Sequence, residues 1–120
     1  MPDLAISPFI AALPKAELHM HLEGSLEPET LVALAARNAV PLPYADAHAL
    51  RRAYAFNDLN SFLELYYLGL TVLQTGQDFF DMTQGYLTRA ASENVRHAEV
   101  FISPQAHLSA PIRCRRRLRG

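Results

Sequence analysis

The sequence predicts an α/β fold in which two parallel strands flank a run of helices. Residues 16–21 and 95–102 read as strands, and the segment 28–93 between them carries apolar residues at helical spacing. Cap-forming residues divide that segment into separate helices. A strand, a helical connection and a second strand form a crossover unit, in which the two strands pair in parallel.

The first expected helix begins at Pro28, because the first turn of a helix does not need the missing N–H of proline. Leu31, Leu34 and Ala35 form its apolar stripe. The helix is expected to end near Asn38, a residue that tolerates the left-handed conformation found after helix ends.

The two middle helices follow a rigid connector, Val-Pro-Leu-Pro at 40–43. Residues 46–54 predict a short helix with two exposed arginines. Asn57 or Asp58 can cap the next helix, which we expect to reach about Leu73.

The last helix begins at Thr75, which with Asp78 three residues later resembles a capping box. We expect this helix to stop at Asn94. At the other end of the chain, residues 1–13 are expected to be a short lead-in whose apolar side chains can pack on the body.

Composition is typical of one small globular domain. Half of the 120 residues are apolar, and no apolar run approaches the roughly 20 residues that span a bilayer. The N-terminus lacks the pattern of a secretory signal. The single cysteine, Cys114, cannot form an internal disulfide, which fits a reducing compartment. We therefore expect a cytoplasmic protein with no membrane partner.

Charge is distributed unevenly along the chain. Residues 1–112 hold six Lys/Arg and twelve Asp/Glu, a formal charge of −6, whereas residues 113–120 hold five arginines. A basic tail can bind nucleic acid electrostatically. No aromatic residues interleave with these arginines, so no nucleic-acid partner is expected.

The most informative motif is His19-Met20-His21 at the end of the first strand. Side chains alternate along a strand, so both imidazoles are expected on one face and Leu18 and Met20 on the other. Two neutral imidazoles on one face can bind a divalent metal, with zinc the first expectation. A pair of solvated or partly buried strand histidines is the alternative that the spacing alone leaves open.

This motif resembles the first barrel strand of the adenosine and adenine deaminase family of zinc-dependent amidohydrolases. The similarity starts with LPKAELHMHLEGS and continues through LEPETLVALAARNAVPLP, AYAFNDLNSFLELYYLG and DFFDMTQGYLTRAASENVRHAEVFISPQAH. It covers about residues 8–107. The resemblance implies the N-terminal portion of an incomplete (β/α)₈ barrel over residues 1–107, followed by a non-homologous, disordered tail over residues 108–120.

The family reaction is the hydrolytic removal of the 6-amino group of a purine, which implies conversion of adenine to hypoxanthine and ammonia in purine salvage. By the resemblance, His19 and His21 are ligands of Zn²⁺. The family's remaining metal ligands and its catalytic glutamate belong to later motifs that this chain does not contain. We therefore expect no catalytic residue within the chain and no activity from the chain alone.

Substrate preference depends on Glu23, because adenosine deaminases have an aspartate at this position, where it contacts the ribose. The longer carboxylate of HLEG would occupy space that the sugar needs, which favours adenine over adenosine. Adenosine remains the second expected substrate, and a simple turn carboxylate is the alternative for Glu23.

The resemblance also indicates which residues would contact the purine. His21 and Glu23 are expected to contact it from the first strand, and Leu59, Phe62 and Leu63 resemble the apolar helix that covers the family's pocket. Such an apolar stripe can equally be ordinary core.

The other histidines do not match the family's motifs. His48 is expected on a polar surface, and His97 is expected to pack or hydrogen-bond locally within the second strand. His107 follows the end of that strand, where a role in the pocket is conceivable. Glu99 is expected to be a structural carboxylate paired with a cation elsewhere.

The arginine-rich tail after His107 has no helical pattern where the family continues with a helix. We interpret it as out-of-frame translation of a GC-rich gene, with a genuine short tail as the alternative. A non-catalytic remnant or interaction module, and assembly with a second chain that supplies the missing strands, are the other hypotheses.

Overall fold

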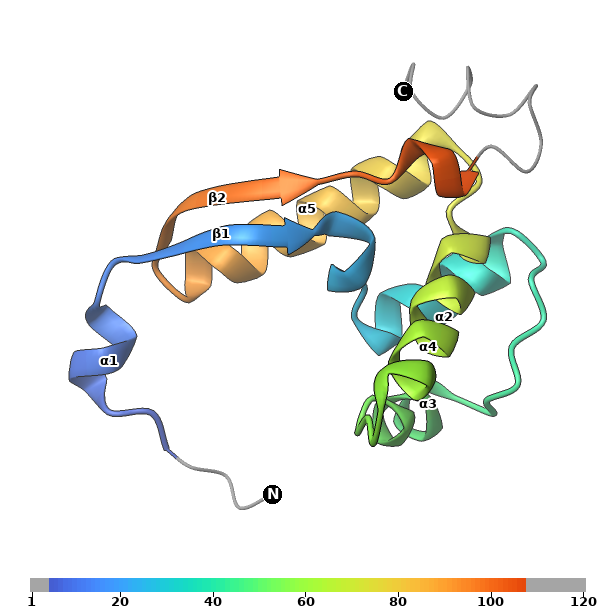
Figure 1. The fold of residues 1–120 in the computed structure, drawn as a ribbon, viewed down its shortest axis with the longest axis horizontal. Coiled ribbons are helices and arrows are strands. Elements are labelled where there is room, and N and C mark those ends of the chain that lie inside the picture. The colour runs from blue at the N-terminus through green and yellow to red at the C-terminus, as the bar shows by residue number, and fades with distance from the viewer. Residues whose placement is uncertain (1–4, 108–120) are drawn as a thin grey trace.

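A computed structural model describes residues 5–107, and two parallel strands, β1 (Lys15–His21) and β2 (Val95–Phe101), lie side by side in it. Figure 1 shows α5 (Gly76–Ser92) running along the sheet and the other long helices gathered beyond the carboxyl ends of the strands. These helices are α2 (Pro28–Arg37), α3 (Ala47–Ala53) and α4 (Leu59–Val72), and two 3₁₀ turns, η1 (Leu22–Ser25) and η2 (Pro104–His107), follow the strands. The α/β prediction and the parallel pairing are confirmed.

The strand register contains an irregularity between Glu17 and Met20, the segment that includes His19. Glu17 pairs with Ala98 and Met20 with Val100, so β1 uses three steps where β2 uses two. The extra residue interrupts the alternation of side chains. Leu18 is therefore 63% exposed while Met20 packs on the core, and the prediction that these two share a face is wrong.

The segment before β1 contains a helix that the sequence analysis did not predict, α1 (Pro8–Ala12). Ser7 caps it through its hydroxyl, and Pro8 occupies its first turn. The expectation that its apolar side chains pack on the body is also wrong. Phe9 is 73% exposed, and no residue of α1 is buried.

Side-chain caps mark the starts of α3, α4 and α5, and Pro28 begins α2 as predicted. Asp58 caps α4 and Thr75 caps α5, each in a reciprocal capping box. α2 ends at Arg37 with Asn38 as its C-cap, as predicted, but the backbone conformation after it differs. Ala39 and not Asn38 adopts the positive φ, of 53°, because the Asn38 side chain is used in a tertiary contact.

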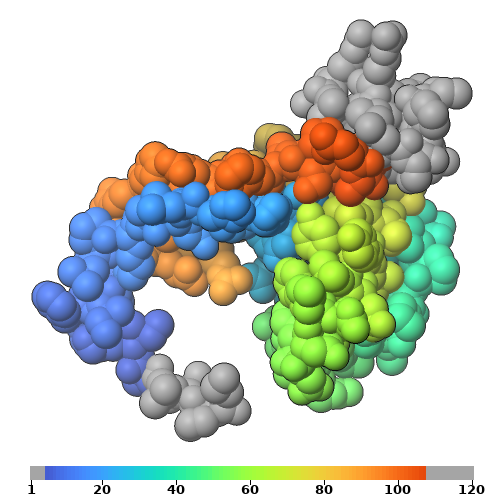
Figure 2. Space-filling view, in the orientation of Figure 1, coloured from blue at the N-terminus to red at the C-terminus, as the bar shows by residue number. Residues whose placement is uncertain are grey.

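The hydrophobic core lies among the helices and η1 and not on the sheet. Leu31, Leu34, Leu50 and Leu73 are almost fully buried there, whereas Phe101 at the end of β2 is 44% exposed. Figure 2 shows these helices as one lobe joined to the strands at their carboxyl ends. The Cα radius of gyration, 15.6 Å, exceeds the roughly 13 Å of a compact 100-residue domain.

Two further expectations concern the membrane and the C-terminal tail. No helix within residues 5–107 is long and apolar enough to cross a membrane. The predicted disordered tail, residues 108–120, lies outside the described residues.

The buried carboxylate of Asp78 connects the helices around the core. Its oxygens accept hydrogen bonds from the backbone N–H groups of Gln74 and Thr75, at 2.9 and 2.8 Å. The Asn38 amide donates to Asp78 at 2.8 Å and to the Val72 carbonyl at 2.7 Å, which ties α2 to the end of α4. Arg37 completes the set with an ion pair at 2.9 Å.

The ionisation of Asp78 is coupled to folding. Burial opposes the charged form, but the donors from Gln74, Asn38, Thr75 and Arg37 outweigh it and lower the pKa of Asp78 below its ordinary value of 3.8. The carboxylate is therefore charged in the folded protein at neutral pH.

Replacing Asp78 by Asn is expected to lower the free energy of unfolding by about 2–4 kcal/mol, because an amide nitrogen then faces buried donors. Asp81→Asn is the matched control, since Asp81 binds the same arginine but its side chain is 29% exposed. The control should cost about 1 kcal/mol or less. Urea denaturation of both variants measures the difference, and equal losses would contradict the role of Asp78.

The contribution of Asp78 should also depend on pH in a defined direction. Since the folded-state pKa is depressed, the stabilisation is complete well above pH 3.8 and is lost as the pH falls through the folded-state value. The difference in unfolding free energy between the wild type and Asp78→Asn should therefore shrink between pH 6 and about pH 3. A constant difference over this range would show that ionisation of Asp78 does not matter.

Candidate functional site

The two histidines of the HxH motif lie next to each other at the carboxyl end of β1. Their ring centroids are 5.2 Å apart, with the ring planes inclined by 60°. Both side chains belong to exposed residues, so the rings are open to solvent. This placement on one side of the strand agrees with the spacing argument.

Phe101, the last residue of β2, flanks both histidine rings. Its centroid lies 4.5 Å from that of His19 and 5.7 Å from that of His21. The strand register places it there, because His21 and Phe101 are paired across the sheet. The phenyl ring thus limits the orientations that both imidazoles can adopt.

The histidine pair fits part of a zinc site. Two imidazoles bound to one tetrahedral zinc at Zn–N distances of about 2.0–2.1 Å have ring centroids roughly 5 Å apart. The observed 5.2 Å matches that separation. Within residues 5–107, no third His, Cys, Asp or Glu joins the pair to form a metal-binding cluster. The described chain therefore offers two ligands, fewer than a tetrahedral site needs.

A pocket of about 390 Å³ opens beside the histidines. The end of β1 and η1 form one side of it, and α4 forms the other. Its lining consists of His19, Met20, His21, Gly24, Phe62, Leu63, Tyr66 and Ser103. The two imidazoles and the apolar side chains of α4 therefore share one opening.

The predicted pocket residues of α4 separate into two groups. Phe62 and Leu63 line the pocket beside the histidines. Leu59 lies one turn earlier, is 68% exposed, and is not part of that lining. Tyr66 follows Phe62 by four residues and lines the pocket too, which helical spacing could have indicated.

Glu23 lies behind the histidines in a smaller, adjoining pocket of about 90 Å³. Its side chain is fully buried, and its Oε1 accepts a hydrogen bond from the Ser103 backbone N–H at 2.7 Å. Aromatic and aliphatic residues surround the rest of this pocket, namely Leu26, Leu31, Tyr54, Phe56, Phe62, Leu65 and Tyr66. Phe62 and Tyr66 line both pockets, so the two adjoin at these side chains.

Gly24 does not require the special backbone freedom of glycine. Its φ is not positive. A Cβ atom at this position would meet the Tyr66 ring at 3.9 Å, which is an ordinary contact. Gly24 is a small residue that lines both pockets.

His107 contacts the site through Glu23 and not through the open pocket. It is buried in η2, and its Nε2 lies 3.3 Å from Glu23 Oε1. The position of His107 after β2 predicted a place near the pocket. Its contact with Glu23 could not be predicted, because 84 residues separate the two.

The other histidines and the glutamate singled out in the sequence, His48, His97 and Glu99, lie on the surface. His97 bonds locally, with Nε2 3.2 Å from Oε1 of Glu99, and both side chains are more than half exposed. The prediction that Glu99 pairs with a distant cation is wrong, because its observed partner is two residues away on the same strand. His48 lies on α3, outside both pockets.

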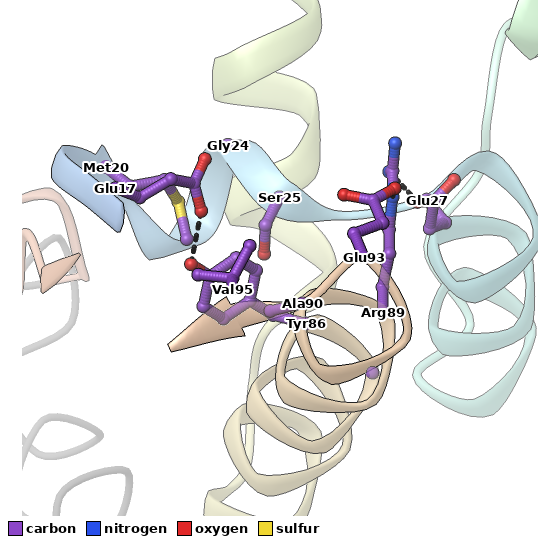
Figure 3. A pocket seen from close by; sticks show the side chains of 11 residues that line it. Glu17, Met20, Gly24, Ser25, Glu27, Tyr86, Arg89, Ala90, Glu93 and Val95 are labelled. Carbon is purple, nitrogen blue, oxygen red and sulfur yellow. Dashed lines mark hydrogen bonds and ion pairs between the residues drawn. The ribbon is translucent and has the colours of Figure 1, made fainter. Parts of the chain in front are cut away.

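A third cavity, of about 240 Å³, lies between β1 and α5, and its lining includes four charged side chains, Glu17, Glu27, Arg89 and Glu93 (Figure 3). Tyr86 on α5 donates a hydrogen bond to Glu17, which raises the pKa of Tyr86 to about 12. Arg89 pairs with Glu27 and Glu93. These polar groups satisfy one another, so we assign this cavity to the packing of α5 on the strand.

Comparison with known proteins identifies the family. The adenosine deaminase family model matches residues 14–117, which extends past His107, where the sequence analysis ended the resemblance. An adenine deaminase from Ralstonia nicotianae is 59% identical over 108 residues, covering 90% of this chain and 31% of that protein. One from Streptomyces coelicolor is 64% identical over 97 residues, covering 81% and 28%.

Solved structures give the same result. The crystal structure of adenine deaminase from Arthrobacter aurescens has a TM-score of 0.79 and 55% identity, and the match covers 88% of this chain and 32% of that one. A zinc-bound amidohydrolase from Burkholderia ambifaria has a TM-score of 0.65 and 34% identity, with coverages of 89% and 30%. The chain spans about a third of the length of the relatives that it matches. Because the family model covers residues 14–117, the chain belongs to the adenosine deaminase family, and the relatives named here are adenine deaminases or amidohydrolases.

Proposed function

We propose that this chain is the N-terminal, metal-binding part of a (β/α)₈-barrel deaminase that uses zinc to convert adenine to hypoxanthine and ammonia. The observation that carries the proposal is the adjacent His19 and His21 rings at the mouth of a pocket that continues toward a buried carboxylate. Its relatives named adenine deaminase support the choice of reaction.

His19 and His21 are the residues that would hold the zinc. Bound there, zinc would lower the pKa of water toward about 7 and so allow hydrolysis at neutral pH. Two imidazoles supply only part of a closed coordination shell. The remaining ligands, the catalytic glutamate and the other residues of the reaction would come from the part of the enzyme that the longer relatives contain.

The chain's own residues would bind and orient the purine. Phe62 and Tyr66 offer aromatic side chains to a flat heterocycle at the junction of the two pockets. Glu23 can accept a hydrogen bond from a ring N–H. Free adenine carries such a donor in its five-membered ring, whereas adenosine carries a sugar on that ring, so the buried carboxylate favours the free base.

The proposal includes a small-molecule partner only. We propose adenine as that partner, with no nucleic-acid or membrane partner, and a cytoplasmic role in purine salvage.

Replacing His19 or His21 by Ala should reduce zinc affinity at least tenfold, because each removes one of two ligands. His97→Ala is the control, since its imidazole is exposed and bonds only locally in β2. Equilibrium dialysis followed by metal analysis measures the affinity of each variant of the chain. If the three variants bind zinc equally, the histidine pair is not the metal site.

A chimera tests the reaction itself. Residues 8–107 replace the corresponding segment of the adenine deaminase from Arthrobacter aurescens, to which this chain is 55% identical. We expect zinc-dependent conversion of adenine, with adenosine a poorer substrate, and loss of activity on His19→Ala. If the chimera folds but is inactive while the parent enzyme is active, the proposal is contradicted. If the chimera converts adenosine faster than adenine, adenosine is the substrate instead.

Shortening the carboxylate tests the basis of the preference. In the chimera, Glu23→Asp should lower kcat/KM for adenine relative to kcat/KM for adenosine by about tenfold. A loss of this size corresponds to one hydrogen bond to a charged group. Asp81→Asn, far from both pockets, is the control. An unchanged ratio in Glu23→Asp would show that Glu23 does not set the preference.

A further inference from the structure

Glu23 and His107 form a buried ionisable pair that joins the ends of the two strands. Glu23 belongs to η1 after β1, and His107 to η2 after β2. The exposed fractions of their side chains are 0% and 4%. Burying two such groups is unfavourable unless they are well paired, so the arrangement calls for a physical reason.

The two oxygens of Glu23 have different surroundings. Oε1 accepts the Ser103 backbone N–H at 2.7 Å and lies 3.3 Å from His107 Nε2. Oε2 is buried and has no hydrogen-bond partner among the described residues. One oxygen is thus fixed by Ser103 and His107, and the other is buried without a described partner beside a pocket lined mainly by apolar and aromatic side chains.

His107 is itself held in place. Its ring meets Phe79 of α5 edge-on, with centroids 5.0 Å apart and planes inclined by 79°. The 3₁₀ turn η2, of which His107 is the last residue, begins at Pro104, directly after Ser103. The imidazole is therefore a fixed donor and not a mobile surface group, and a carboxylate oxygen facing its Nε2 can only accept.

We propose that His107 is a positioning residue that sets substrate preference by holding Glu23 Oε1, so that Oε2 is presented to the ring N–H of a flat nitrogen heterocycle. Without the imidazole, the Glu23 carboxylate can rotate about its Cγ–Cδ bond, so that either oxygen can accept the hydrogen bond from the Ser103 amide. The acceptor offered to the ligand is then lost. The identity of the heterocycle as adenine rests on the proposed function.

Two amide substitutions separate positioning from simple packing. In His107→Gln, the side-chain nitrogen can occupy the place of Nε2, whereas in His107→Asn the shorter side chain cannot reach Glu23. Both introduce a polar amide in the same buried position, so any general disturbance of packing is shared.

The first measurement uses the chain itself and needs neither zinc nor purine. The ¹⁵N-labelled chain reports the Ser103 amide proton, whose chemical shift and exchange rate depend on its bond to the Glu23 carboxylate. Wild type and His107→Gln should agree, and His107→Asn should show an upfield shift and exchange about tenfold faster. An unchanged Ser103 amide in His107→Asn, or equal changes in both variants, would overturn the positioning role.

The second measurement uses the chimera with adenine. His107→Asn should raise KM for adenine about tenfold while kcat changes less, and His107→Gln should restore KM to within about threefold of wild type. Equal kinetics of all three proteins, or equal damage in both variants, would overturn the proposal. If the chimera is inactive toward adenine, the proposed function is rejected. The measurements on the Ser103 amide then test the role of His107 independently.

Discussion

The parallel pairing of β1 with β2 is the constraint on which the candidate site depends. It places His21 opposite Phe101, so that one aromatic ring flanks both imidazoles. It also brings the turn after each strand to the same edge of the sheet, where the Glu23 carboxylate accepts the Ser103 amide. Parallel strands have their carboxyl ends on one side, so Glu23 after β1 and Ser103 after β2 meet although 80 residues separate them.

The helical lobe sets the other wall of the pocket, and Asp78 fixes that lobe. Through Asn38 and Arg37, this one carboxylate connects α2 with the start of α5 and the end of α4. Because α4 carries Phe62 and Tyr66, its position decides how wide the opening beside the histidines is. A network that lines neither pocket thus contributes to the shape of the site.

The sequence predicted what depends on local chemistry and missed what depends on distant partners. Caps such as Asp58 and Thr75 bond within their own first turn, so their helices could be placed from the sequence. The positive φ of Ala39 could not, because Asn38 is occupied by a contact 40 residues away. The burial of Glu23 could not be predicted for the same reason. The sequence indicated Glu23 as a candidate substrate contact, but its partners, Ser103 and His107, lie 80 and 84 residues later in the chain.

The unpaired oxygen of Glu23 has an energetic cost that folding alone does not explain. A buried polar atom without a hydrogen bond destabilises a protein by about 1–3 kcal/mol, and few such atoms persist in native structures. An apolar side chain in the same space would pack against Leu26 and Leu31 without that cost. A carboxylate whose other oxygen is firmly held is instead suited to bind a donor from outside the chain. The arrangement therefore favours a ligand that brings a ring N–H into an aromatic pocket.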